Sequence, residues 1–189
     1  MTRTTLPLFG IALLVSALAG TTTLGATEGQ VSDREPQQHA SHDGGSYPPT
    51  LVEQVREATE IYRQTIPVEY QQFLGCVSGP EEGAMGVHFV NFALVDGKPE
   101  VKAPEALIYE VKNGRARLVG VEYIVPVAAW NPAAGEPPVP VLEGQVFHFN
   151  DSPNRFGLPA FYELHVWAWR DNPNGAFADW NTGVSCEGR

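Results

Sequence analysis

Three of the five histidines and two glutamates lie inside apolar stretches of the sequence, and these residue types can bind a transition metal. His88 lies in GVHFV, His148 in VFHFN and His165 in ELHVW, while Glu122 lies in GVEYI and Glu163 precedes His165 by two residues. Neutral imidazoles combined with a carboxylate suit Zn, Cu, Fe or Mn. We therefore consider His88, His148, His165, Glu122 and Glu163 candidate ligands of a divalent transition metal.

Glu163 and His165 belong to FYELHVWAW, residues 161–169, which has the composition of a β-strand. Successive side chains of a strand point to opposite faces, so one face should carry Phe161, Glu163, His165, Trp167 and Trp169. Burying a carboxylate and an imidazole on such a face is costly unless each has a partner. The partner is a metal ion, a small organic ligand in a pocket lined by aromatic residues, or an internal hydrogen-bond network; the pocket residues would be Tyr123, Trp167 and Trp169.

The elements that must position these residues are one helix and about five strands. Residues 49–73 have the helical period, with Leu51 and Val55 on one stripe, Thr50 and Glu53 spaced as a capping box, and Pro67 expected to end or kink the helix. Strand-like stretches follow at 83–94, 105–111, 115–127, 145–150 and 161–169. This order predicts an α+β domain, with the helix packed on a curved antiparallel sheet or small β-barrel.

The dipeptide Asn113-Gly114 predicts a two-residue hairpin turn, because both residues readily take positive φ. Counting outward from this turn pairs Tyr109 with Leu118 and, further along, Glu105 with Glu122. The same count puts Glu122 on a face with apolar neighbours from both strands: Leu107, Tyr109, Leu118 and Ile124.

Cys76 and Cys186 are the only cysteines, and the start of the chain resembles an export signal. Arg3 precedes a short apolar run and a small-residue cleavage pattern, so residues 1–26 are interpreted as a signal peptide and the protein as secreted or periplasmic. In an exported protein two cysteines favour a disulfide. Residues 27–48 are polar and lack apolar periodicity, which indicates a disordered linker, and residues 49–189 form a single domain.

The formal net charge is −10, and it becomes −11 when a signal peptide containing Arg3 is removed. Such an acidic chain disfavours nucleic acid and anionic membrane surfaces as partners, and it leaves a small molecule or a metal ion. No G-x-S-x-G elbow or phosphate-binding glycine loop is present, so the sequence assigns no catalytic residue and leaves enzymatic activity open.

Three stretches give the chain its resemblance to a group of uncharacterised exported bacterial proteins. They are GCVSGPEEGAMGVHFVN at 75–91, LVGVEYIVP at 118–126 and YELHVWAWRDNPNGAFADWN at 162–181. The resemblance implies export and supplies no catalytic residue. The same three stretches carry His88, Glu122, Glu163 and His165.

Overall fold

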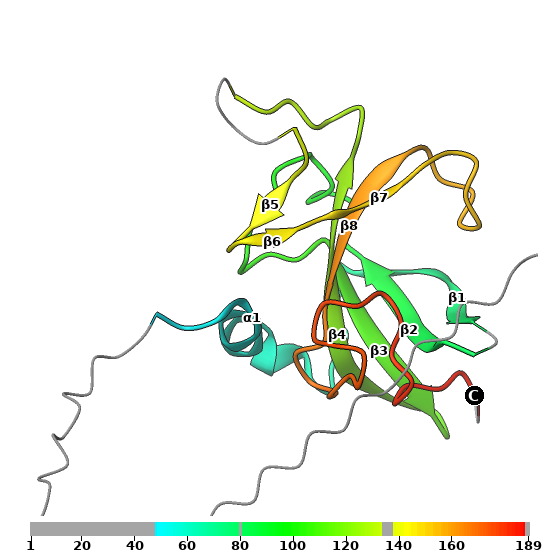
Figure 1. Ribbon diagram of the computed structural model, residues 1–189. Helices are drawn as coiled ribbons and strands as arrows, with labels where there is room; N and C mark the ends of the chain where they lie inside the picture. Colours follow the sequence, from blue (N-terminus) through cyan, green and yellow to red (C-terminus); the bar gives the residue numbers. More distant parts are fainter. Residues whose placement is uncertain (1–47, 80, 134–137, 188–189) are drawn as a thin grey trace, which may run out of the picture. The chain divides into compact units, whose positions relative to one another are not determined.

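The computed structural model describes residues 48–79, 81–133 and 138–187. The predicted signal peptide and all but the last residue of the predicted linker lie outside these residues. Those described belong to one compact unit of the chain, which contains one short helix and a curled antiparallel sheet (Figure 1). None of its helices is long and apolar enough to cross a membrane.

The helix α1 spans Leu51–Thr59 and continues as the 3-10 turn η1, Glu60–Tyr62. The predicted capping box is present: the Thr50 side chain accepts a hydrogen bond from the Glu53 backbone N–H, and the Glu53 side chain accepts one from the Thr50 backbone N–H. The helical region ends at Tyr62, before Pro67. Residues beyond Tyr70, included in the helical pattern of the sequence, form a strand instead.

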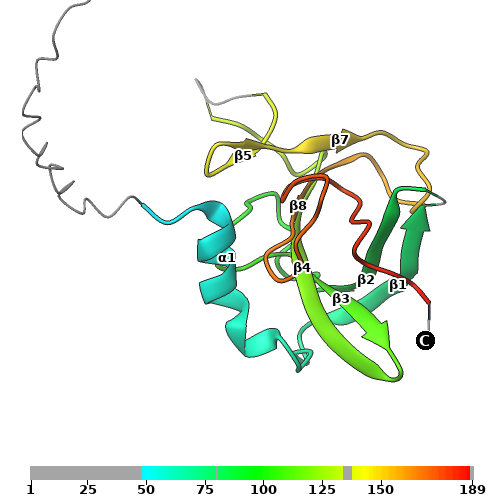
Figure 2. The ribbon, with the colours of Figure 1, turned by 60° about the horizontal axis from the view of Figure 1, so that its bottom comes forward.

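Six strands form one sheet in the order β1-β2-β3-β4-β8-β7, with every neighbouring pair antiparallel. The sheet curls into a half-barrel (Figure 2), which confirms the predicted fold class. A separate hairpin pairs β5, Val141–Leu142, with β6, Gln145–Val146. The bounds of the six strands are β1 Gln71–Gly79, β2 Gly83–Val90, β3 Ala106–Lys112, β4 Arg115–Pro126, β7 His148–Asn150 and β8 Phe161–Val166.

The β3–β4 hairpin confirms the predicted turn and then departs from the predicted register. Asn113 and Gly114 have φ of 52° and 70°, and Tyr109 pairs with Leu118 as counted from the turn. The register then shifts by one residue, so that Ala106, not Glu105, pairs with Glu122. The predicted pairing of Glu105 with Glu122 is therefore wrong, because β4 contains an extra residue between Leu118 and Val121, as in a β-bulge.

The two faces of the sheet have different environments. The outer face packs against α1, whose Leu51 and Val55 join a core made by every second strand residue: Leu107, Tyr109, Leu118, Val121, Tyr123, Leu164 and Val166. The C-terminal segment, residues 167–187, begins beside the outer core, which Ala168 joins, and its later part lies inside the curl (Figure 2). At one end of this inner face, a second buried cluster joins Ile108, Val119 and Trp167 to Val184.

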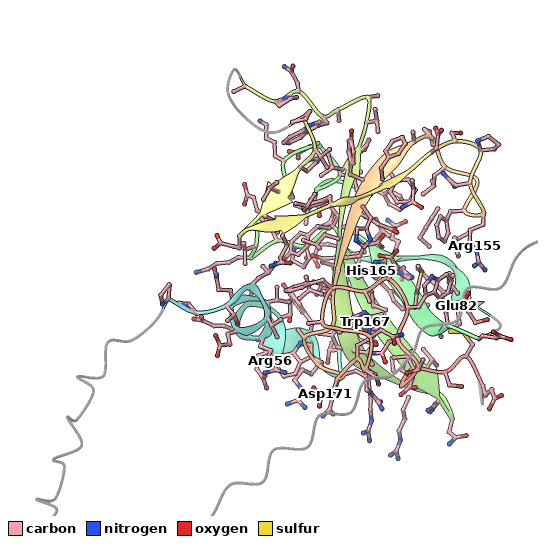
Figure 3. All side chains as sticks on the ribbon, viewed as in Figure 1. Arg56, Glu82, Arg155, His165, Trp167 and Asp171 are labelled. Carbon is pink, nitrogen blue, oxygen red and sulfur yellow. A yellow bond between two sulfur atoms is a disulfide. The ribbon has the colours of Figure 1, made fainter. Side chains whose placement is uncertain are left out.

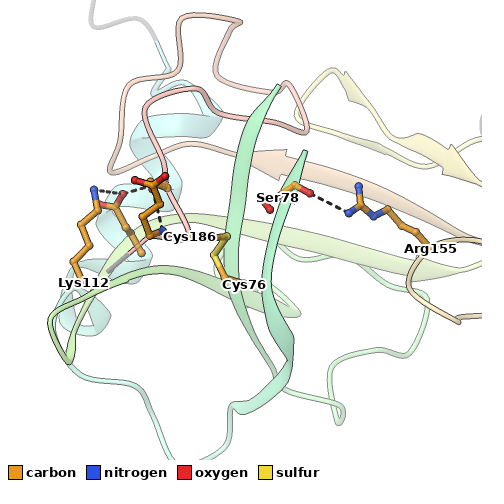
Figure 4. The surroundings of a disulfide bond; sticks show 8 residues. Cys76, Ser78, Lys112, Arg155 and Cys186 are labelled. Carbon is orange, nitrogen blue, oxygen red and sulfur yellow. Dashed lines mark hydrogen bonds and ion pairs between the residues drawn. A yellow bond between two sulfur atoms is a disulfide. The ribbon is translucent and has the colours of Figure 1, made fainter. Parts of the chain in front are cut away.

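A disulfide joins Cys76 in β1 to Cys186 in the C-terminal segment, with the two Cα atoms 5.7 Å apart (Figure 4). This confirms the predicted pairing. The same segment is paired to β2 through two backbone hydrogen bonds between Ala84 and Asn181, at 3.1 and 3.2 Å. The C-terminal segment is therefore fixed to the inner side of both β1 and β2.

Glu105, directly before β3, is a buried carboxylate, and we expect it to make the stability of the protein depend on pH. Burial raises the pKa of Glu105 to about 8, although its Oε2 accepts a hydrogen bond from the Ile124 N–H at 3.1 Å. Because this pKa is above the unfolded value, the folded state holds a proton that the unfolded state releases. Stability should fall as pH rises from the unfolded pKa to about 8, and then level off.

The variant Glu105→Gln keeps an acceptor for the Ile124 N–H and cannot ionise. Urea unfolding of metal-free protein between pH 6.5 and 8 should show wild type losing about 1.5 kcal/mol more than the variant over this range. The buried histidines, whose pKa is lowered in the folded state, contribute equally to wild type and variant, so their effect cancels in the difference between the two proteins. Equal pH dependence in the two proteins would contradict the prediction.

Candidate metal centre

Four of the predicted ligands lie together on the inner face of the sheet. His88 comes from β2, Glu122 from β4, and Glu163 and His165 from β8. Glu122 and His165 are directly paired across β4 and β8, and His88 Nε2 lies 3.4 Å from Glu122 Oε2. One ligand atom from each of His88, Glu122 and His165 lies within 4.8 Å of the others, a spacing that can hold a metal ion.

His165 is the central residue of the cluster. It is fully buried, and neither of its ring nitrogens has a hydrogen-bond partner. Its ring centre lies 5.9 Å from that of His88, with the two rings at right angles, and it stacks on Trp167 with ring centres 6.0 Å apart. His165 and Trp167 both lie in the middle of the sheet region (Figure 3). A buried polar atom without a partner costs about 1–3 kcal/mol. Both nitrogens of His165 therefore lack a hydrogen bond, and the nearest carboxylate to Nδ1, that of Asp179, lies 3.7 Å away.

A second group of ligand atoms shares His165 and includes a residue that the sequence pattern did not predict. Asp179, in the C-terminal segment, forms this group with Glu163 and His165, again with ligand atoms within 4.8 Å of one another. Asp179 Oδ1 lies 3.7 Å from His165 Nδ1 and 2.8 Å from His148 Nδ1. The signal that could have indicated Asp179 is its position in AFADWN, a carboxylate between aromatic residues.

His148 lies at the edge of the cluster. Its side chain is 54% exposed, and its Nδ1 is hydrogen-bonded to Asp179. Neither of the two groups of ligand atoms that contain His165 includes His148. His148 is therefore placed to position Asp179, with the carboxylate between the two imidazoles.

Burial determines the protonation of the centre. It lowers the pKa of His88 to about 4, and burial together with the nearby His88 also lowers the pKa of His165, so both imidazoles are neutral at pH 7. Burial raises the pKa of Glu122 well above its ordinary value, and repulsion by Glu163 raises it further. Burial also raises the pKa of Glu163, while a side-chain hydrogen bond with Glu122 opposes the rise. A divalent cation would supply the positive charge that this pair of buried carboxylates lacks.

The three aromatic residues expected to line a ligand pocket are not brought together. Tyr123 lies in the outer core, where its hydroxyl donates to the Val101 carbonyl at 2.7 Å. Trp169 packs on the same outer core and donates to Thr59 Oγ1, while Trp167 belongs to the inner cluster. The predicted common face for Trp167 and Trp169 is wrong, because β8 ends at Val166 and its alternation ends with it.

A cavity of about 30 Å³ reaches three cluster residues, His88, Glu122 and Glu163. Its other walls are apolar and include Phe73, Met85 and Phe161. This volume is sufficient for one or two water molecules. The centre therefore has space beside it for a ligand that the protein itself does not provide.

The chain matches no family model, no curated protein and no solved structure.

Proposed function

We propose that the protein binds one divalent transition metal ion through His88, His165 and Glu122. The observation that supports this proposal is His165, whose two buried ring nitrogens have no hydrogen-bond partner although carboxylates and a second imidazole lie beside them. A structural network would give each imidazole a hydrogen bond. Two imidazoles and a carboxylate are ligands typical of Zn, Cu, Fe or Mn, and they disfavour Mg and Ca, which take oxygen ligands.

Glu163 and Asp179 have supporting roles in this proposal. Glu163 is hydrogen-bonded to Glu122 and borders the adjoining cavity, where it would orient a bound ligand or accept its proton. Asp179 would hold His165 through Nδ1, as carboxylates commonly hold metal-bound histidines. A bound ion would supply a Lewis acid at the inner end of the cavity.

We further propose that the protein acts outside the cytoplasm, in a periplasm or as a secreted protein. The Cys76–Cys186 disulfide supports this, because structural disulfides form and persist in oxidising compartments. The amino-terminal sequence, with Arg3 before a short apolar run, agrees with export.

Elemental analysis of protein purified without a histidine tag tests the metal proposal. We expect close to one Zn, Cu, Fe or Mn per chain in wild type and a loss of at least 90% of that metal in the His88→Ala/His165→Ala variant, roughly the loss that a 100-fold weaker site produces. The matched control is His39→Ala/His42→Ala, which removes two imidazoles from the predicted linker and should keep its metal. Metal-free wild-type protein that also fails to take up Zn²⁺ or Cu²⁺ on titration would overturn the proposal.

A further inference from the structure

A second cavity, of about 160 Å³, adjoins the small cavity at the centre. Five residues line both cavities, namely Phe73, Val90, Ile124, Leu158 and Phe161. The lining of the outer cavity is entirely apolar and is completed by Phe92, Val95, Pro126, Pro159 and Ala160. The two cavities therefore lie side by side, and together they offer an apolar space whose inner part reaches His88, Glu122 and Glu163.

The mouth of this space carries apolar side chains in contact with solvent. Phe92 is 55% exposed and packs edge-to-face on Phe73, with ring centroids 6.0 Å apart. Leu74, which borders the inner cavity, is 44% exposed. Exposed apolar residues that surround a concave opening mark a place where an apolar molecule enters.

One wall of the space is the loop 151–160, which contributes Phe156 and Leu158. Arg155 fixes this loop to β1, because its Nη2 donates a hydrogen bond to the Ser78 carbonyl at 3.0 Å (Figure 4). The guanidinium of Arg155 also lies 5.1 Å from the centre of the Trp180 ring. The wall is thus held in place on both sides, which gives the cavity a defined volume.

Size and charge limit what this space can accept. A cavity of 150 Å³ lined by aliphatic and aromatic residues holds benzene, so the outer cavity at about 160 Å³ suits an apolar body of one benzene ring. Neither cavity is lined by a lysine or an arginine among the described residues, while Glu122 and Glu163 stand at the inner end. Glu122 and Glu163 together balance the charge of a divalent ion, so an anionic head group would add a negative charge without a partner. A cationic head group would compete with the ion for the same carboxylates.

We propose, building on the metal centre proposed above, that this space binds a small uncharged alcohol or phenol. The hydroxyl lies at His88, Glu122 and Glu163, where it donates to a carboxylate, and the benzene-sized body fills the outer cavity. A bound metal ion would strengthen the site, because the hydroxyl oxygen is a ligand for it. The carboxylate that accepts the hydrogen bond from the hydroxyl is the one that does not coordinate the ion.

The test uses tag-free protein loaded with Co²⁺, with the metal content measured on the same sample before titration. In isothermal titration calorimetry, benzyl alcohol should bind with a dissociation constant on the order of 0.1 to 1 mM, as expected for a ligand of eight heavy atoms. Benzoate and benzylamine have the same ring and a charged head, and each should bind at least about tenfold more weakly. Tighter binding of either charged analogue would overturn the proposed ligand class.

Two cavity variants locate the binding. Ala160→Phe should fill the outer cavity and weaken benzyl alcohol binding at least about tenfold, with the Co²⁺ content unchanged. Phe92→Ala removes an aromatic wall and should weaken it roughly threefold or more. The matched control is Phe149→Ala, a phenylalanine equally 55% exposed that lines neither cavity, and it should bind as wild type does.

The outcomes separate the two proposals. Co²⁺-loaded protein that does not bind benzyl alcohol, or whose binding is unaffected by both Ala160→Phe and Phe92→Ala, overturns the alcohol site and leaves the metal centre standing. Protein that takes up none of Co²⁺, Zn²⁺ and Cu²⁺ but binds benzyl alcohol, with the expected sensitivity to the two variants, overturns the metal centre and supports the apolar site.

Discussion

The variant His165→Leu is expected to be more stable than wild type when both are metal-free, by about 1 to 2 kcal/mol. Leucine has a volume close to that of histidine and has no polar atom, so it removes two buried nitrogens that lack partners. Trp167, which stacks on the His165 ring, would pack against the leucine side chain in the variant. Such a gain is typical of residues kept for binding rather than for folding.

The same variant should lose at least about 100-fold in metal affinity, since changes that only affect the orientation of a ligand already cost 10- to 100-fold. Urea unfolding with a chelator measures the first effect. The second is measured by thermal unfolding with Zn²⁺ in excess, where an ion at 100 times its dissociation constant should raise the wild-type melting temperature by about 8 °C. Leu164→Ala, in the outer core beside His165, is the control and should lower stability.

A destabilised metal-free His165→Leu protein would contradict the prediction and indicate a structural role for the imidazole. The two effects are measured separately, so a change in folding cannot be mistaken for a change in metal binding. The control variant should keep its Zn²⁺-dependent rise in melting temperature, because Leu164 points to the opposite face of β8.

Loss of the Cys76–Cys186 bridge is expected to lower the free energy of unfolding by about 4 to 5 kcal/mol. The two cysteines are 110 residues apart, so the bridge restricts a long loop of the unfolded chain. The double variant Cys76→Ala/Cys186→Ala and reduced wild type should lose the same amount, because the sequence contains no other cysteine.

Guanidinium unfolding of oxidised wild type, reduced wild type and the double variant measures this loss. A loss below about 1 kcal/mol in both altered proteins would contradict the prediction, since it would mean that the bridge restricts little. A metal titration of the same three proteins adds a second result. Because the bridge anchors the segment that carries Asp179, affinity should fall when it is absent, and Asp179→Asn should produce a similar fall with the bridge intact.

The sequence predicted the parts of the fold that depend on local chemistry. The capping box at Thr50 and Glu53, the Asn113-Gly114 turn and the α+β class all follow from residue types at short spacing, and all are present. Strand β1 was not predicted, because QQFLGCVSG lacks apolar alternation and contains two glycines. It is an edge strand, mostly exposed, so its pairing with β2 rather than its own pattern makes it a strand.

The candidate site was predicted in part for the same reason. Polar residues within apolar strands indicated His88, Glu122, Glu163 and His165, because a polar group on a buried strand is visible in the sequence. Asp179 was not predicted, because it reaches the cluster through the tertiary placement of a segment without helix or strand. Trp169 was placed on the wrong face, since the end of β8 at Val166 depends on the turn that follows.

The extra residue in β4 has a consequence for how such a centre can be gained or lost in evolution. Leu118 and Val121 both lie in the outer core although they are three residues apart, so the alternation of faces along β4 is interrupted between them. As a result, Glu122 points to the inner face. Deleting one residue there would turn Glu122 toward the helix and Tyr123 toward His88. A single codon inserted or removed, with no substitution at any ligand, would thus be enough to assemble or dismantle the carboxylate side of the centre.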